Sequence, residues 1–310
     1  MRAVLNAALP VFALILTGAA CGRSGMFDRQ ATDNLNRFAI YLALPALLFV
    51  AMARITPDQA GQGGFALAFG GGIVVTFVFG FVLSRWRGGN AAIASIEGLD
   101  ASYSNVGFMG LPLCLLVFGP GSLPMAVIAT LFTACVLFLS AVALIEFNLQ
   151  RSASFGRTLG KVLVSLLRNP LLLAPLAGLG MALAGFPLPV PVEQFATLLG
   201  GAASPVALIC IGLFLAQERV TLHDAIPVGM LVGLKLIVQP GLTALLAVPL
   251  LHLPPLQAHV AVLLSALPIG SGPFTIAKLY GLEARVTSGA ILASHVISVV
   301  TVSVLVAWFG

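Results

Sequence analysis

Charged residues are scarce in this sequence. Asp, Glu, Lys and Arg make up 8% of the 310 residues, whereas hydrophobic residues make up 59%. A water-soluble globular chain carries roughly a quarter charged residues, because it must cover its apolar interior with a polar surface. The shortage of charge therefore excludes an ordinary soluble domain and indicates a protein embedded in a lipid bilayer.

Motifs for metal, nucleotide or covalent chemistry are also missing. The four cysteines lie in or at the end of hydrophobic stretches, and no CxxC or Cys/His spacing suits zinc. There is no ATP-binding motif, no HExxH and no GxGD, and Ser271 with His295 lacks a supporting pattern for a hydrolase. We therefore expect no cofactor, no metal site and no enzymatic activity.

Basic residues outnumber acidic ones by 15 to 10, but they form no cluster that would suit nucleic acid. They are dispersed in short loops between apolar stretches, and their distribution between alternate loops indicates which side of the membrane each loop lies on. If the N-terminus lies outside, the outer side holds Arg2 and Arg54, and Lys235 falls inside a helix. The remaining twelve, on the cytoplasmic side, are Arg23, Arg29, Arg37, Arg85, Arg87, Arg151, Arg157, Lys161, Arg168, Arg219, Lys278 and Arg285. This bias predicts that both termini lie outside the cytoplasm.

Apolar stretches long enough to cross about 30 Å of hydrocarbon at 1.5 Å per residue follow one another along the chain. We expect ten membrane helices, near residues 3–21, 36–54, 64–84, 92–118, 122–145, 170–186, 192–216, 225–248, 257–281 and 286–309. The first imitates a signal peptide, but the further apolar stretches favour an uncleaved membrane helix. The protein is therefore expected to be an all-α, multi-pass membrane protein.

The ten expected helices divide into two halves of five. Residues 1–150 pair with residues 161–310 at a fixed shift of 160, which leaves 151–160 as a cytoplasmic connection. Prolines and glycines coincide at this shift in the pairs Pro10 and Pro170, Pro45 and Pro205, Gly18 and Gly178, Gly25 and Gly185, Gly110 and Gly270, and Gly121 and Gly281. Each half has an odd number of crossings, so the second enters the membrane from the opposite side, as an inverted repeat.

The longest connection, from Glu146 to Asn169, has apolar residues at helical spacing with basic residues between them. We expect it to lie along the cytoplasmic face. Two interpretations remain open, a membrane-surface hinge between the halves and a plain linker helix.

The fourth and ninth expected helices, in corresponding positions, contain helix-breaking residues near their midpoints. The fourth reads SYSNVGFMGLPLC and the ninth reads SALPIGSGPFTIAK. The residues that we expect to bind substrate at these breaks are Asn105, Gly107, Gly110, Pro112, Pro268, Gly270, Ser271 and Gly272. Proline leaves a carbonyl one turn earlier unpaired, here those of Phe108, Leu264 and Ile269. Unwound backbone at this depth is tolerated only inside protein or beside a watery cavity, so the pair predicts a central site, with kinked packing helices as the alternative.

Each break also predicts a helix that resumes in the middle of the membrane. Pro112 and Pro273 both suit the first turn of a resumed helix. The unpaired N–H groups and the dipole of a helix N-terminus attract anions. The sequence therefore favours a carboxylate or a similar group as the substrate.

Lys235 lies about ten residues into the eighth expected helix, roughly 15 Å deep at 1.5 Å per residue. A buried ammonium needs a partner, so we expect it to face Asp100, Glu97 or a bound anion. Its counterpart at the shift of 160 is Val75, which argues against a symmetric structural role. A substrate-binding role is favoured, and a structural ion pair is the alternative.

Glu97, Asp100 and Ser104 share one face of the fourth helix. A carboxylate in this position can carry a coupling proton or sodium ion, and we assign this role to Asp100 and, with less support, Glu97. Glu97 also suits a solvated or loop-pairing group. His295 in the tenth helix is expected to pack or to form a hydrogen bond between helices rather than to relay protons.

Four segments resemble the auxin efflux carrier family, which includes malonate carriers and is related in fold to bile acid symporters. They are NLNRFAIYLALPALLF, SNVGFMGLPL, LKLIVQPGL and the run from PIGSGPFTIAKLYG to SHVISVVT. The resemblance implies a ten-helix inverted repeat in which helices four and nine cross at the substrate site. Helices one, two, six and seven would form a scaffold, and helices three to five and eight to ten a transport domain. His295 departs from the small hydroxylated residue that the resemblance leads us to expect.

Together these features predict a secondary active permease for a small organic anion, a mono- or dicarboxylate such as malonate. A channel or a ligand-sensing membrane protein is the alternative. The resemblance implies a bacterial inner membrane, with the bilayer and the anion as partners, no nucleic acid, and a homodimer as one possible assembly.

Overall fold

The computed structural model describes residues 2–55, 62–148, 160, 170–217 and 224–309. These residues are almost entirely helical, and their only β-type pairing is one isolated antiparallel bridge between Ser104 and Ile269. Most of the connection expected between Glu146 and Asn169 lies outside the described residues.

Each of the ten expected stretches contains helix. The first half comprises α1 (Arg2–Arg23), α2 (Arg29–Phe38), η1 (Ala39–Ala43), α3 (Leu44–Ala53), α5 (Gly63–Trp86), α6 (Ala91–Ser102), η2 (Val106–Gly110), α7 (Leu111–Phe118), η3 (Pro120–Ser122), α8 (Leu123–Leu131), η4 (Phe132–Leu137) and α9 (Phe138–Asn148). The second half comprises α11 (Pro170–Leu183), α12 (Val190–Gly201), α13 (Ala203–Gln217), α14 (Ala225–Gly233), η6 (Leu234–Val238), α15 (Gln239–Leu245), η7 (Leu246–Leu250), α16 (Pro255–Ser265), α17 (Gly272–Leu279) and α18 (Arg285–Phe309).

Five continuous helical stretches are long and apolar enough to cross a membrane by length and composition. They are Arg29–Ala53, Gly63–Trp86, Val190–Phe214, Ala225–Leu250 and Arg285–Phe309. Other apolar helices among the described residues are shorter, notably those of the expected fourth and ninth helices, which are interrupted. The chain is thus all-helical, with several stretches suited to lipid.

Three of the helices contain a π-helical turn that ends two residues before a proline. The turns η1, η2 and η6 precede Pro45, Pro112 and Pro240. A proline cannot donate to the carbonyl four residues earlier, and its ring crowds that carbonyl. The wider i→i+5 turn relieves this conflict without ending the helix.

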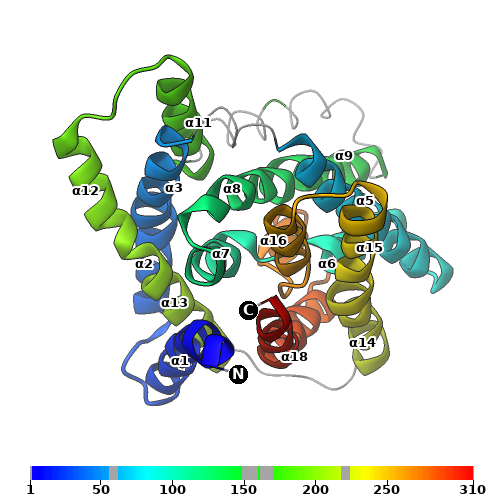
Figure 1. Cartoon of the computed structure of the whole chain (residues 1–310). Helices are drawn as coiled ribbons and strands as arrows, with labels where there is room; N and C mark the ends of the chain where they lie inside the picture. The colour runs from blue at the N-terminus through cyan, green and yellow to red at the C-terminus, as the bar shows by residue number, and fades with distance from the viewer. Residues whose placement is uncertain (1, 56–61, 149–159, 161–169, 218–223, 310) are drawn as a thin grey trace.

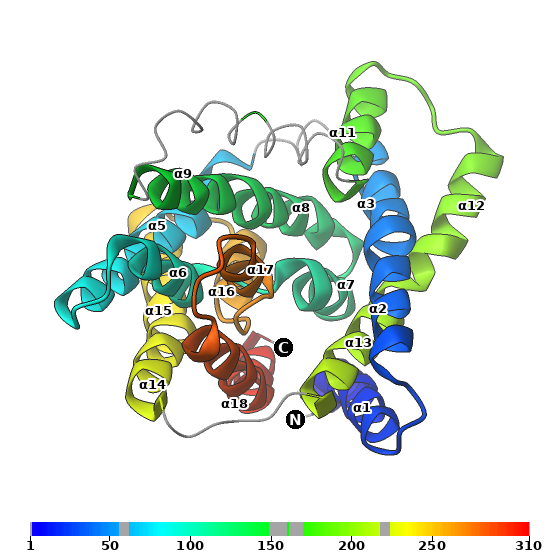
Figure 2. The same ribbon diagram turned by 180° about the vertical axis from the view of Figure 1, so that it is seen from behind.

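The helices form two groups (Figures 1 and 2). In the first group, α1 packs along α13, α3 packs along α11 and α12, and α2 contacts α13. In the second group, α5 packs against α6, α15 and α16, while α14 and α6 contact α18. The helices α7 and α8 link the groups, since α7 contacts α1 and α13, and α8 contacts both α3 and α5.

Glycines bring the helices of the first group into backbone contact. A Cβ atom on Gly18 of α1 would collide with the carbonyl oxygen of Ile209 in α13. A Cβ atom on Gly178 of α11 would collide in the same way with the carbonyl oxygen of Phe49 in α3. Small residues allow this close approach between membrane helices, which is the main source of packing energy in lipid.

Candidate functional site

The two helix breaks lie against each other in the second group of helices. The backbone N–H of Asn105 donates to the carbonyl of Pro268 at 2.9 Å, and the N–H of Gly270 donates to the carbonyl of Tyr103 at 3.0 Å. These bonds form the antiparallel bridge between Ser104 and Ile269. Each break therefore satisfies backbone groups that the other has left unpaired, as buried polar groups require.

The break in the fourth helix lies earlier in the chain than Gly107, Gly110 and Pro112, the residues from which it was predicted. The helix α6 ends at Ser102, and helical structure resumes at Val106 as η2. Gly107, Gly110 and Pro112 therefore lie in the resumed helix. A Cβ on Gly110 would lie 2.8 Å from the side chain of Leu264, whereas Gly107 has open space at this position. Gly110 is thus a packing position against α16.

The break in the ninth helix runs from the end of α16 to Gly272, and Pro273 occupies the first turn of α17, as expected. Pro268 and Gly270 are buried, whereas Ser271 is exposed. A Cβ atom on Gly272 would lie 2.5 Å from the ring of Tyr103, and one on Gly270 would lie 2.9 Å from the same ring. The glycines at this break therefore make room for the Tyr103 ring.

Lys235 is fully buried in the π-helical turn η6. Its Nζ donates to the carbonyl oxygen of Ser265 at 2.6 Å, at the last residue of α16. Among the described residues it makes no ion pair, so the expected pairing with Asp100 or Glu97 does not form. Its charge instead sits at the negative end of a helix dipole, where cations are favoured.

Asp100 is fully buried and accepts a 2.8 Å hydrogen bond from the hydroxyl of Thr287 in α18. Its second oxygen, Oδ1, has no partner in the described part of the chain. Glu97 pairs with Arg87 at 3.0 Å, which agrees with the loop-pairing expectation, although Glu97 is buried rather than solvated. Both carboxylates therefore keep one oxygen without a partner among the described residues, Oδ1 of Asp100 and Oε2 of Glu97.

Two adjacent residues of α18, Ser294 and His295, each form a hydrogen bond with one of the two breaks. The backbone N–H of Ile269 donates to the hydroxyl of Ser294 at 3.1 Å. The amide Nδ2 of Asn105 lies 3.1 Å from Nε2 of His295, which forms the hydrogen bond between helices that was expected of this histidine. A third contact comes from Gln239, whose Nε2 donates to the carbonyl oxygen of Ser102, the last residue of α6, at 3.1 Å.

A family model described as "Membrane transport protein" matches residues 3–306. The chain belongs to the auxin efflux carrier family.

Three relatives of this carrier align along nearly their whole length. A protein of Rhizobium meliloti named "Putative malonate transporter" is 29% identical, covering 98% of this chain and 95% of the relative. The "Uncharacterized transporter YfdV" of Escherichia coli K12 is 25% identical, with 94% and 93% covered. "Auxin efflux carrier component 5" of Arabidopsis thaliana is 24% identical, with 99% and 96% covered. The chain is accordingly a multi-pass membrane transporter and not an enzyme.

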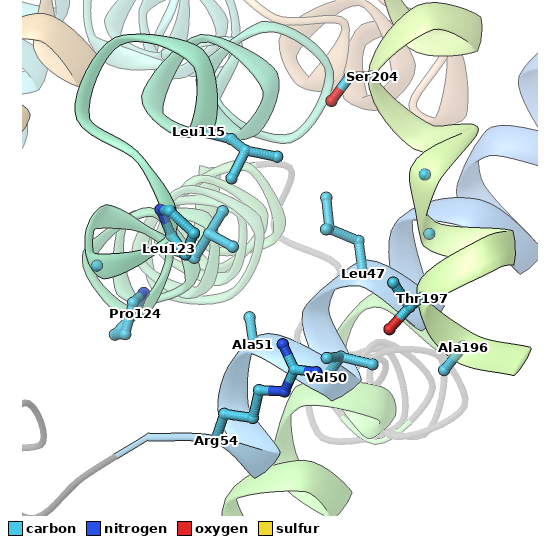
Figure 3. Close-up of a pocket in the computed structure, with 14 residues that line it drawn as sticks. Leu47, Val50, Ala51, Arg54, Leu115, Leu123, Pro124, Ala196, Thr197 and Ser204 are labelled. Carbon is cyan, nitrogen blue, oxygen red and sulfur yellow. The ribbon is translucent and has the colours of Figure 1, made fainter. Parts of the chain in front are cut away.

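A cavity of about 370 Å³ lies between the first helix group of the carrier and the linking helices α7 and α8. Figure 3 shows α3 on one side of it, with Leu47, Val50, Ala51 and Arg54, and the α7–α8 region on the other. Its walls are mostly apolar, and Arg54, which pairs with Glu193, brings a positive charge to it. The cavity therefore adjoins α7, the helix that resumes after the first break.

Sequence reasoning missed Tyr103, Thr287 and Ser294 in this carrier. Tyr103 is the first residue of the first break, and its place beside the helix-breaking residues is a local signal that could have been used. Thr287 and Ser294 are hydroxyl residues on the same helix as His295, but nothing local shows that they face Asp100 and Ile269. Within the described residues, no group of three or more His, Cys, Asp or Glu side chains is placed to hold a metal ion.

Proposed function

We propose that this carrier is a secondary active transporter of a small organic anion, a mono- or dicarboxylate such as malonate. The observation that carries the proposal is the crossing of the two breaks, with the buried ammonium of Lys235 at the end of α16. The ammonium and the N-terminal ends of the two resumed helices place positive charge where most of the chain is apolar. The name of the Rhizobium meliloti relative supports malonate as the first substrate to test.

The anion binds between the starts of the two resumed helices, at Asn105, Gly107, Gly110 and Pro112 on one side. On the other side it meets Pro268, Gly270, Ser271 and Gly272. The helix starts supply N–H donors and partial positive charge. Lys235 contributes the full charge, because a carboxylate competes with the Ser265 carbonyl for its ammonium.

The ten helices form two inverted repeats of five, residues 1–150 and 161–310. The helix ends at Gly25 and Gly185, 160 residues apart, support this arrangement because both adopt positive φ, 75° and 69°. The next residue bonds back in the same pattern in each, from Met26 to Cys21 and from Phe186 to Met181. The glycine contacts of Gly18 with Ile209 and of Gly178 with Phe49 are also related by 160 residues.

Helices one, two, six and seven, which form the first helix group, act as a scaffold. Helices three to five and eight to ten carry the site as a transport domain that moves against it during alternating access. In the orientation predicted from basic residues, with both termini outside the cytoplasm of a bacterial inner membrane, the cavity beside Arg54 lies in the outer half. It is the route by which the anion approaches α7.

A coupling ion, H⁺ or Na⁺, acts at Asp100, whose Oδ1 has no hydrogen-bond partner among the described residues, with Glu97 as the second candidate.

Counterflow in proteoliposomes tests the whole proposal. Vesicles preloaded with unlabelled malonate should accumulate labelled malonate transiently and with saturation, which neither a channel nor a sensor would do. The absence of counterflow with a panel of mono- and dicarboxylates, with and without pH and sodium gradients, would overturn it.

A further inference from the structure

The two ring nitrogens of His295 have different partners. Nδ1 lies 2.8 Å from the backbone carbonyl oxygen of Ile291, one turn earlier in α18. A carbonyl oxygen can only accept, so Nδ1 carries the hydrogen. Nε2 therefore has a lone pair in the neutral imidazole, and it accepts from the Nδ2 amide of Asn105 at 3.1 Å. The histidine thus fixes which end of the Asn105 amide faces it.

This orientation leaves Asn105 unsuited to an anion. With Nδ2 turned to the histidine, the carbonyl Oδ1 is the other end of the amide, and the side-chain hydrogen bond of Asn105 seen in the described part of the chain is the one from Nδ2. Asn105 retains 8% of its surface exposed and directly precedes the resumed helix η2. An acceptor at this point repels a carboxylate, whereas an N–H donor would bind it.

We propose that His295 is a positioning residue whose protonation reverses the Asn105 amide. The inference rests on the proposed transport of a carboxylate and adds a means of control at the same site. A hydronium ion from solvent gives a proton to Nε2, so the Nε2–H bond forms while an O–H bond of the hydronium breaks and water is released. Nδ1 keeps its hydrogen, which stays bonded to the carbonyl oxygen of Ile291. The imidazolium then donates to Oδ1 of Asn105, and Nδ2 turns to donate to the bound carboxylate.

Binding of the anion and binding of this proton favour each other. The imidazolium charge and the anion attract, and water screens little at a buried site. Where the free site is neutral and the occupied site is protonated, affinity for the carboxylate changes about tenfold per pH unit. The carrier therefore binds its anion more tightly as pH falls.

Other charged groups near α18 do not contact the ring within the described residues. Asp100 is bound to Thr287, eight residues before His295 and about 12 Å away along the helix at 1.5 Å per residue. Lys235 is bound to Ser265. The remaining titratable groups on or beside the elements packed against α18 are Arg2, Cys21, Arg23, Glu97, Tyr103, Asp224, His259, Lys278, Tyr280, Glu283 and Arg285.

The test measures binding of labelled malonate to purified protein in nanodiscs between about pH 6.5 and 8.5, where carboxylic acids are ionised. Wild-type affinity should weaken by up to about tenfold per pH unit. His295→Gln should flatten this dependence, because a glutamine amide can pair with Asn105 in either direction but cannot take a proton. His259→Gln, at a histidine that stacks on Phe309 away from the site, should keep the slope. A slope that survives in His295→Gln, or disappears equally in His259→Gln, overturns the proposal.

A second measurement covers the case in which His295→Gln does not fold. A triple variant, His223→Gln, His252→Gln and His259→Gln, leaves His295 as the only histidine for ¹⁵N labelling. Its spectrum should show the Nδ1–H tautomer without malonate and two protonated nitrogens with saturating malonate. A neutral ring both with and without malonate refutes the proposed role of His295 but leaves the proposed transport function standing. Absence of saturable binding of any carboxylate to wild type at every pH refutes the proposed function as well.

Discussion

The two helix groups pack through different kinds of contact. In the first group, α1 against α13 and α11 against α3, glycines bring backbone against backbone. In the second group, buried polar residues hold the crossing together, and some of their oxygens, such as Oδ1 of Asp100 and Oγ of Ser104, have no partner among the described residues. Close backbone packing and buried oxygens without partners therefore lie in different parts of the same chain.

The largest effect should come from removing the buried ammonium of Lys235 in the second group. Lys235→Met should lower malonate counterflow by about a hundredfold, because a hydrogen bond to a buried charged group contributes roughly 1.5–3 kcal/mol and the anion also loses its counter-charge. Leu234→Met places the same side chain one position earlier and should transport normally. Normal transport by Lys235→Met, with an unchanged melting temperature in detergent, would remove Lys235 from the site.

The glycine contacts of the first group should respond to a single methyl group. Gly18→Ala and Gly178→Ala should each lower stability by roughly 1–3 kcal/mol, because the added Cβ meets a backbone carbonyl that cannot move away easily. Gly180→Ala is the control, since its Cβ meets open space and alanine favours the helix by roughly 0.5–1 kcal/mol. Melting temperatures that fall for Gly180→Ala as much as for the other two would contradict the backbone-contact explanation.

The hydrogen bond between Thr287 and Asp100 tests whether the polar contacts of the second group stabilise it. Thr287→Val keeps the shape but removes the donor at 2.8 Å, so we expect a loss of about 1–3 kcal/mol in thermal unfolding. Thr17→Val removes an exposed hydroxyl that bonds only within α1 and should change little. Equal melting temperatures for the wild type, Thr287→Val and Thr17→Val would mean that the hydrogen bond between Thr287 and Asp100 does not stabilise the fold.

The smallest effect should come from the charge beside the cavity. The side chains of Arg54 and Glu193 are 57% and 30% exposed, and exposed ion pairs contribute at most about 1 kcal/mol. Arg54→Ala should therefore leave stability nearly unchanged and raise the KM for malonate by about twofold to fivefold, with the difference shrinking in high salt. Arg85→Ala, predicted to lie on the opposite side of the membrane, should show no change in KM for uptake from the Arg54 side.

Much of the helical framework could be predicted from local sequence. The stretches expected to be helical coincide with helices because apolar length alone dictates them in lipid. Pro273 sits in the first turn of α17 as expected, because proline at that position lacks only a hydrogen that the helix start does not use.

The contacts that close the site could not be predicted in the same way. The break in the fourth helix lies at residues 103–105 and not at Pro112, because a π-helical turn absorbs the proline and the bridge to Pro268 and Gly270 holds the unwound residues. The partner of Lys235 is a carbonyl that becomes free only because α16 ends at Ser265. Such partners depend on where a distant helix ends, which composition and spacing do not report.

The bridge between Ser104 and Ile269 has a consequence for synthesis. The ribosome delivers the chain from its N-terminus, so residues 103–105 enter the membrane more than 160 residues before their backbone partners exist. Until Pro268 and Gly270 arrive, the N–H of Asn105 and the carbonyl of Tyr103 need water, lipid headgroups or a helper protein to bind them. The first half of the transporter is therefore inserted in an unfinished state, and only the ninth helix completes it.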